Sequence, residues 1–135
     1  TIRVSLAADP AEEVQVGYEI LKSLRLRQRG VNVVACPSCG RVQIDVDKLA
    51  AELERDLAHV EKPITVAVMG CEVNGPGEAH DADVGVAAGH RSGLIFVKGE
   101  KVGLVPYEDI KSAILRKVEE MDSEPTADPS PAMGA

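Results

Sequence analysis

The sequence predicts an α/β domain in which helices pack on a small mixed sheet, in the order β-α-β-α-β-β-β-α. Short runs rich in valine and isoleucine alternate with longer segments whose apolar residues recur at helical spacing. Gly, Pro and Asp residues stand at the expected ends of these elements. Because aromatic residues make up only 2% of the chain, the core must be aliphatic.

The N-terminal segment is expected to form a strand over residues 1–7 and a helix over residues 10–29. Apolar and polar residues alternate in the first of these stretches, as in a half-buried strand. Asp9 and Pro10 are typical of a helix start, and Gly30 suits the position that follows a helix end. Because the chain opens directly in a strand pattern at Thr1, we expect it to be a piece of a longer protein.

The remaining elements follow the same two patterns. A second helix is expected to start near Asp45 or Asp47 and to end at Pro63, and a last helix covers residues 107–121. Strands are expected over residues 31–35, 64–69, 83–88, 94–98 and 101–105. Residues 122–135 are rich in Pro, Ser, Asp and Ala, so we expect a disordered tail.

Charge and hydropathy exclude two classes of partner. The net charge of −7 argues against nucleic acid, because binding phosphates requires a basic surface. No apolar run approaches the roughly 20 residues that a membrane-spanning helix needs. We therefore expect a soluble intracellular protein that binds neither nucleic acid nor a membrane.

The three cysteines are the strongest chemical signal in the chain. Cys36 and Cys39 follow one predicted strand, and Cys71 follows another. Binding sites of open α/β sheets gather where strands end, so the three thiols are expected to converge. Glu78 lies seven residues beyond Cys71 in a Gly-Pro-Gly turn, and could supply a fourth ligand to an iron–sulfur cluster.

Spacing alone leaves more than one kind of site open. A zinc site would need a fourth Cys or His, and of His59, His80 and His90 only His80 is placed plausibly in the sequence. A redox dithiol is less favoured, because residues 41–45 alternate like a strand where such a dithiol needs a helix N-terminus. Three interpretations of the cysteine pattern therefore remain open. The cysteines could hold an iron–sulfur cluster, they could hold a structural zinc ion, or the domain could bind only a partner.

Whole segments of the chain resemble a known family. The sequence is similar to the C-terminal part of the 4-hydroxy-3-methylbut-2-enyl diphosphate synthases of the non-mevalonate (MEP) route of isoprenoid biosynthesis. The resemblance covers roughly residues 1–121, and the loop from Cys71 to Glu78 is its most specific part. The segments that carry it are residues 1–6, 21–30, 35–41 and 70–79.

The resemblance implies two structural units. Residues 1–30 would be the last strand and helix of an otherwise missing (β/α)8 barrel. Residues 31–121 would be an iron–sulfur cluster domain of the nitrite/sulfite-reductase-like type. A [4Fe-4S] cluster would be held by Cys36, Cys39, Cys71 and Glu78.

The resemblance also implies an activity. Such an oxidoreductase reductively opens 2-C-methyl-D-erythritol 2,4-cyclodiphosphate to 4-hydroxy-3-methylbut-2-enyl diphosphate and water. Reduced flavodoxin or ferredoxin would donate the electrons to a homodimer in the bacterial cytoplasm, or in a plastid if the source is a plant or alga. Because most of the barrel would be missing, we expect this chain alone to be inactive.

Three further interpretations rest on the resemblance. Glu78 would mark the reactive iron, because a carboxylate exchanges more readily than a thiolate. Asn74 would hydrogen-bond the substrate or the leaving hydroxyl, although an Asn also stabilises its own tight turn. Arg3 and Ser5 would bind the diphosphate, the alternative being solvated side chains on an edge strand.

A basic patch comprises Lys22, Arg25, Arg27 and Arg29 at the end of the first predicted helix. Its simplest role is to complement the negative end of the helix dipole. The alternative is a landing site for an acidic electron donor, or a contact between subunits.

Overall fold

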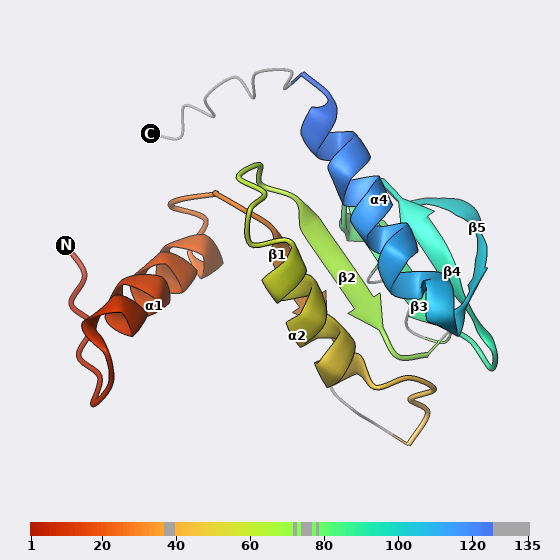
Figure 1. The fold of residues 1–135 in the computed structure, drawn as a ribbon, viewed down its shortest axis with the longest axis horizontal. Coiled ribbons are helices and arrows are strands. Elements are labelled where there is room, and N and C mark those ends of the chain that lie inside the picture. Colours follow the sequence, from red (N-terminus) through yellow and green to blue (C-terminus); the bar gives the residue numbers. More distant parts are fainter. Residues whose placement is uncertain (37–39, 72, 74–76, 78, 126–135) are drawn as a thin grey trace.

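The computed structural model describes residues 1–36, 40–71, 73, 77 and 79–125 (Figure 1). Over these residues the chain forms a five-stranded mixed sheet and three α-helices, in agreement with the predicted α/β class. The helices are α1 (Pro10–Ser23), α2 (Val46–Asp56) and α4 (Ile110–Ser123), and the 3-10 turns are η1 (Ala79–Asp81) and η2 (Tyr107–Asp109). The strands are β1 (Asn32–Ala35), β2 (Thr65–Met69), β3 (Val84–Ala88), β4 (Ser92–Val97) and β5 (Glu100–Pro106).

The sheet follows the chain in strand order β1-β2-β3-β4-β5. β1, β2 and β3 run parallel, with Val33 opposite Val66 and Val66 opposite Val84. β3, β4 and β5 then pair antiparallel through tight turns. Parallel pairs require long crossovers, which α2 and the segment after Cys71 provide, whereas antiparallel pairs need only short turns.

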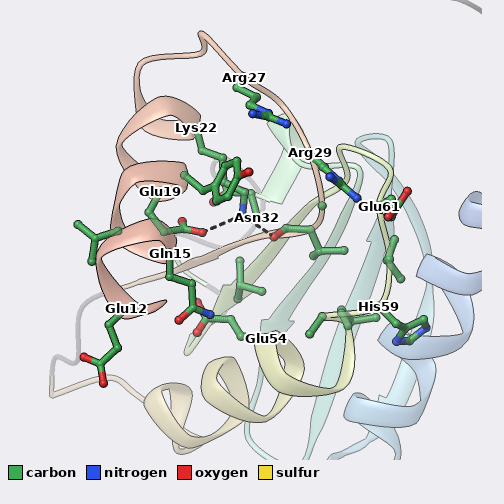
Figure 2. Close-up of a pocket in the computed structure, with 18 residues that line it drawn as sticks. Glu12, Gln15, Glu19, Lys22, Arg27, Arg29, Asn32, Glu54, His59 and Glu61 are labelled. Atoms are coloured by element: carbon green, nitrogen blue, oxygen red, sulfur yellow. Dashed lines mark hydrogen bonds and ion pairs between the residues drawn. The ribbon is translucent and has the colours of Figure 1, made fainter. Parts of the chain in front are cut away.

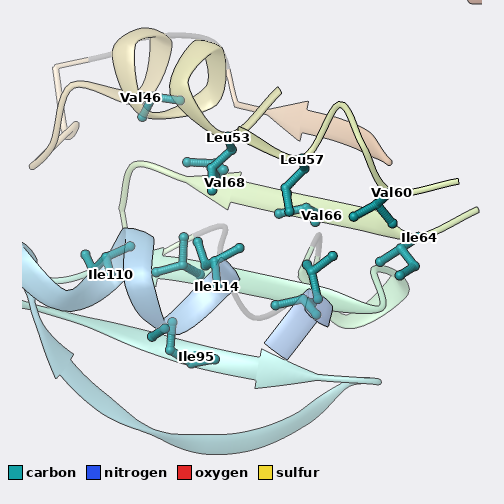
Figure 3. Packing of buried hydrophobic residues seen from close by; sticks show 14 residues of the cluster. Val46, Leu53, Leu57, Val60, Ile64, Val66, Val68, Ile95, Ile110 and Ile114 are labelled. Carbon is teal, nitrogen blue, oxygen red and sulfur yellow. The ribbon is translucent and has the colours of Figure 1, made fainter. Parts of the chain in front are cut away.

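The main core lies between the sheet and the two helices α2 and α4, which cover the same face (Figures 1 and 3). Leu53 of α2 and Ile114 of α4 are each 0% exposed. The strands contribute alternate residues to this face, because successive side chains point to opposite sides of a strand. These include Val66, Val68, Val84, Val86 and Ile95. The aliphatic core expected from the composition is confirmed.

Lys111 joins the two covering helices. Its ammonium lies 3.0 Å from Glu52 and 2.8 Å from Asp56, both on α2. The hydrogen bond from Lys111 holds the pKa of Asp56 below its ordinary value, and hydrogen bonds to Asp56 and Glu52 raise the pKa of Lys111. Both groups therefore remain charged at neutral pH, and the contact fixes α4 against α2.

The N-terminal segment differs from its prediction. Residues 1–6 form no strand in the structure, because the sheet begins at Asn32 and gives them no neighbouring strand to pair with. The helix predicted over residues 10–29 does begin after its Asp9 cap, but it ends at Ser23. Arg25 adopts a left-handed φ of 54°, and the N–H of Leu26 returns to the carbonyl of Leu21, which closes the helix.

The C-terminal helix ends later than predicted. α4 continues to Ser123, so the first residues of the expected disordered tail are helical. Residues 126–135 of that tail lie outside the described residues. None of the helices in the described part of the chain combines the length and apolar character needed to cross a bilayer.

α1 buries none of its residues. Val14 and Leu24 are each 59% exposed, and Leu26 just beyond the helix is 72% exposed. The helix contacts the rest of the chain through Lys22, which donates to the Val31 carbonyl at 3.3 Å, through Glu13, which accepts from the N–H of Leu6 at 3.0 Å, and through Ile2 and Val4, which lie beside Gly17. The apolar side of α1 is therefore available to a second surface.

Replacing Ile114 with Ala should destabilise the fold by about 2–5 kcal/mol, because the cavity lies in a closed core. Urea unfolding followed by circular dichroism measures this loss. Val102→Ala on β5 is the control, since Val102 is 53% exposed and its truncation should change the unfolding free energy little. Equal losses in the two variants would contradict the core described above.

The exposed apolar side of α1 should make the isolated chain associate with itself. Sedimentation velocity should show a mass that rises with concentration, and Val14→Lys with Leu24→Lys should abolish this rise. Gln15→Lys adds the same kind of charge to the same helix without removing apolar surface, and should leave association unchanged. A monodisperse monomer at all concentrations would show the expectation to be wrong.

Candidate metal centre

Parallel pairing brings two cysteine-bearing segments to one edge of the sheet. Cys36 directly follows β1, and its N–H continues the ladder to the Val68 carbonyl at 3.1 Å. Cys71 follows β2 by two residues. Because β1 and β2 run in the same direction, both cysteines lie at the edge where the parallel strands end, which we call the carboxyl edge. The prediction that these two segments leave the carboxyl ends of strands is therefore confirmed.

A direct contact joins the two segments. The N–H of Gly70 donates to Sγ of Cys36 at 3.1 Å. Cys71 is only 8% exposed, and Cys36 is partly buried and packs against the core. The Cys36 sulfur therefore lies against the peptide that precedes Cys71.

Gly70 is held by the segment that leads into α2. Its carbonyl accepts from the N–H of Gln43 at 2.8 Å. A Cβ on Gly70 would lie 2.7 Å from Cγ2 of Val46 and 3.1 Å from Cγ2 of Val42. Periodicity and spacing do not point to these residues, although a glycine between a buried strand and a cysteine is a recognisable sign of close approach. Residues 41–45, expected to alternate like a strand, are irregular and end in the Asp45 cap of α2.

The remaining predicted ligands fall outside the described residues. These are Cys39 and Glu78, and Asn74 lies outside them as well. Among the residues that the structure describes, no three His, Cys, Asp or Glu side chains gather closely enough to hold a metal ion. The described part of the chain thus contributes two converging cysteines.

The histidines occupy places that the sequence did not predict. His80, the plausible zinc ligand from spacing, packs against Gly99 in the β4–β5 turn, with its Nε2 3.0 Å from the Cβ position of Gly99. That turn lies at the amino edge of β3, because Val97 pairs with Val84. The carboxyl edge is roughly 15 Å away at about 3.3 Å per residue, whereas a zinc–nitrogen bond is about 2 Å. The segment that contains His80 must return to the start of β3, which explains its position.

The β3–β4 turn lies at the carboxyl edge, next to Cys71. Met69 pairs with Ala87, so Gly89 reaches the level of Cys71, and His90 follows with an exposed side chain. The hydroxyl of Tyr107 donates to the Gly89 carbonyl. Burial raises the pKa of Tyr107 above its ordinary value of 10.0, so the hydroxyl keeps its proton and holds the turn.

Arg3 and Ser5 lie in the N-terminal segment, where both are exposed. This segment runs beside α1, since a Cβ on Gly17 would contact Ile2 and Val4. None of the contacts of the described residues joins Arg3 or Ser5 to Cys36 or Cys71.

A cleft of about 880 Å³ lies between α1, the start of β1 and the end of α2 (Figure 2). It is lined by residues such as Gln15, Asn32, Glu54 and His59. These residues surround the amino end of β1, so the cleft lies away from the cysteines, which follow the carboxyl ends of β1 and β2. We therefore assign the candidate metal centre to the carboxyl edge and not to this cleft.

Three members of the basic patch have local partners around the cleft (Figure 2). Lys22 pairs with Glu19 at 3.1 Å, and Arg29 pairs with Glu61. The guanidinium of Arg27 lies 4.8 Å from the centre of the Tyr18 ring. Only Lys22 belongs to the last turn of α1, so the helix dipole accounts for one member of the patch.

The donor set fits a sulfur-ligated centre. Cys36 and Cys71 lie at one edge of the sheet, and the sulfur of Cys36 accepts a backbone N–H. Thiolates that hold iron–sulfur clusters have similar surroundings, and such hydrogen bonds tune the reduction potential of the cluster. Cys36 and Cys71 are the described residues that would hold the group. Cys39 and Glu78 complete the set of the sequence prediction.

Comparison with known proteins gives a consistent result. The GcpE protein C-terminal domain family matches residues 32–120. Proteins named 4-hydroxy-3-methylbut-2-en-1-yl diphosphate synthase (flavodoxin) are 54% identical in Geobacter sulfurreducens and 55% identical in Symbiobacterium thermophilum, each over 92% of this chain. One from Streptomyces avermitilis is 52% identical over 98% of the chain.

The chain spans about a third of the length of these relatives, 35%, 34% and 36% respectively. The family match covers both described cysteines and the whole sheet, from the first residue of β1 to within α4. The chain therefore belongs to the family of the GcpE protein C-terminal domain.

Proposed function

We propose that this chain is the cluster-bearing part of an enzyme that converts 2-C-methyl-D-erythritol 2,4-cyclodiphosphate to 4-hydroxy-3-methylbut-2-enyl diphosphate and water. The convergence of Cys36 and Cys71 at the carboxyl edge is the observation that carries the proposal. The names of the relatives supply the product, and the resemblance described above supplies the substrate.

Cys36, Cys39, Cys71 and Glu78 would hold a [4Fe-4S] cluster. When bound, the cluster would supply the electrons for reductive ring opening. Three thiolates and one carboxylate suit this task, because the harder and more exchangeable oxygen ligand leaves one position open to substrate. Glu78 would mark that position.

Three other residues would act on the substrate. Asn74 would donate a hydrogen bond to the substrate or to the departing hydroxyl. Arg3 and Ser5 would bind the diphosphate, Arg3 through its guanidinium and Ser5 through its hydroxyl. Because both are exposed and none of the contacts of the described residues joins them to Cys36 or Cys71, this function needs a second element to bring them to the site.

The relatives' names suggest flavodoxin as the electron donor. We propose flavodoxin or a ferredoxin as the partner, a homodimer as the working form and the bacterial cytoplasm as the location. We do not place the donor on the basic patch, because Lys22, Arg27 and Arg29 have partners there. The patch also lies at the amino end of β1, away from the cysteines at the carboxyl edge.

A structural zinc site is the second candidate. The position of His90 at the carboxyl edge favours it, since this histidine follows the turn beside Cys71. Zinc would then be held by the three thiolates and one imidazole.

Anaerobic purification should yield a brown chain with about four iron and four acid-labile sulfide atoms, the content of one [4Fe-4S] cluster. Cys36→Ser and Cys71→Ser should each lose most of this iron, while Ser112→Ala, an exposed serine on α4, should keep it. A colourless chain with one zinc and no sulfide would favour the second candidate, and a folded chain with neither would leave a partner-binding domain.

Replacing Glu78 with Cys should preserve the cluster but close the exchangeable position. Electron paramagnetic resonance of the reduced cluster tests this with cyanide as a small ligand. The spectrum of the unchanged chain should shift on adding cyanide, and that of Glu78→Cys should not. Equal shifts in the two proteins would remove the special role of the carboxylate.

A further inference from the structure

Gly70 has three separate contacts that converge on the candidate metal centre. Its N–H reaches Sγ of Cys36, its carbonyl accepts from Gln43, and its vacant Cβ position faces Val46 and Val42. No other glycine in the described part of the chain donates its N–H to a sulfur atom. The first contact comes from the residue after β1 and the other two from residues 42–46, so together they fix one peptide at the carboxyl edge.

We propose that Gly70 is a positioning residue for the metal centre: its amide holds the Cys36 sulfur in place beside Cys71. This inference rests on the proposed function for the identity of the group, but the contact itself does not need that group. A backbone N–H that points at a thiolate stabilises negative charge on sulfur. Once the cluster is bound, the same N–H favours the reduced and more negative state, and so raises the reduction potential.

The position requires glycine for lack of space. Gly70 does not have a left-handed φ, so an alanine could adopt its backbone conformation. A Cβ there would, however, lie 2.7 Å from Val46, which is 1% exposed at the start of α2 and has no room to withdraw. The peptide of residue 70 would have to move instead, and its N–H would leave the Cys36 sulfur.

This geometry predicts a rescue. Gly70→Ala alone should displace the amide, whereas Gly70→Ala combined with Val46→Ala removes the closest methyl group and should allow the amide to return. Val42 remains at 3.1 Å, and its partly exposed side chain can shift by a few tenths of an ångström. If Gly70 had only a structural role, the double variant would not restore the hydrogen bond from the residue 70 amide to the Cys36 sulfur.

Hydrogen exchange of the metal-free chain, followed by nuclear magnetic resonance, tests the contact. Cys36→Ala should speed exchange of the Gly70 amide about tenfold relative to the residue 36 amide, the factor for a hydrogen bond worth about 1.4 kcal/mol. Cys36→Ser keeps an acceptor and should restore part of the protection. The residue 36 amide, which donates to the Val68 carbonyl through the backbone, is the internal reference once each rate is divided by the intrinsic exchange rate of its own sequence. The proposal would be overturned if the Gly70 amide exchanged at the same rate, relative to the residue 36 amide, in the unchanged chain and in both Cys36 variants.

The reconstituted chain tests the consequence. Gly70→Ala should hold a cluster of lower reduction potential than the unchanged chain, and the double variant with Val46→Ala should return toward the original value. Val46→Ala alone and Gly103→Ala, where a Cβ meets no described atom within 4 Å, are the controls and should keep that value. An unchanged potential in Gly70→Ala at normal iron content would overturn the tuning role.

The two arms separate this inference from the proposed function. If the unchanged chain takes up no iron and sulfide, the proposed function fails, and hydrogen exchange still decides whether Gly70 holds Cys36. If the cluster forms but neither exchange nor potential responds, the role of Gly70 fails and the proposed function stands.

Discussion

The parallel pairing of β1, β2 and β3 is the constraint on which the candidate metal centre depends. Parallel strands end at the same edge of a sheet, so Cys36, Cys71 and the β3–β4 turn reach one place although they are far apart in sequence. The N–H of Gly70 then fixes the first cysteine against the second segment. A shift of one residue in the β1–β2 register would turn Cys36 to the other face and remove this contact.

The two faces of the sheet serve different purposes. α2 and α4 cover one face with a large aliphatic core, which gives the strands a fixed position. On the other face η1 packs against β2, β3 and β4 over a smaller cluster that includes Ala67 and Ala87. Small side chains let η1 lie close to the strands. η1 therefore packs on this face of the sheet, while Cys71 remains at the carboxyl edge.

Local pattern was enough to predict most of the fold. Strands β1 to β5, the Asp45 cap of α2 and the stripe of Leu53 and Leu57 follow from periodicity and capping, because each is set by residues near in sequence. Two features depend on more than periodicity. Residues 1–6 show a strand pattern but have no neighbouring strand, and α1 ends early through a left-handed Arg25, a conformation rare for arginine. Sequence spacing also misplaced His80, since a crossover can carry nearby residues to the opposite edge.

The placement of the histidines bears on which metal the site suits. His59 and His80 belong to the amino edge, where the cleft and the β4–β5 turn lie, whereas His90 lies in the β3–β4 turn at the carboxyl edge. A zinc site would have to draw this exposed residue inward from a turn that Tyr107 holds through Gly89. A cluster needs no imidazole, and it gains from an N–H aimed at sulfur, which is already present at Cys36. We therefore propose sulfur-rich coordination for the centre and keep a zinc site that includes His90 as the alternative.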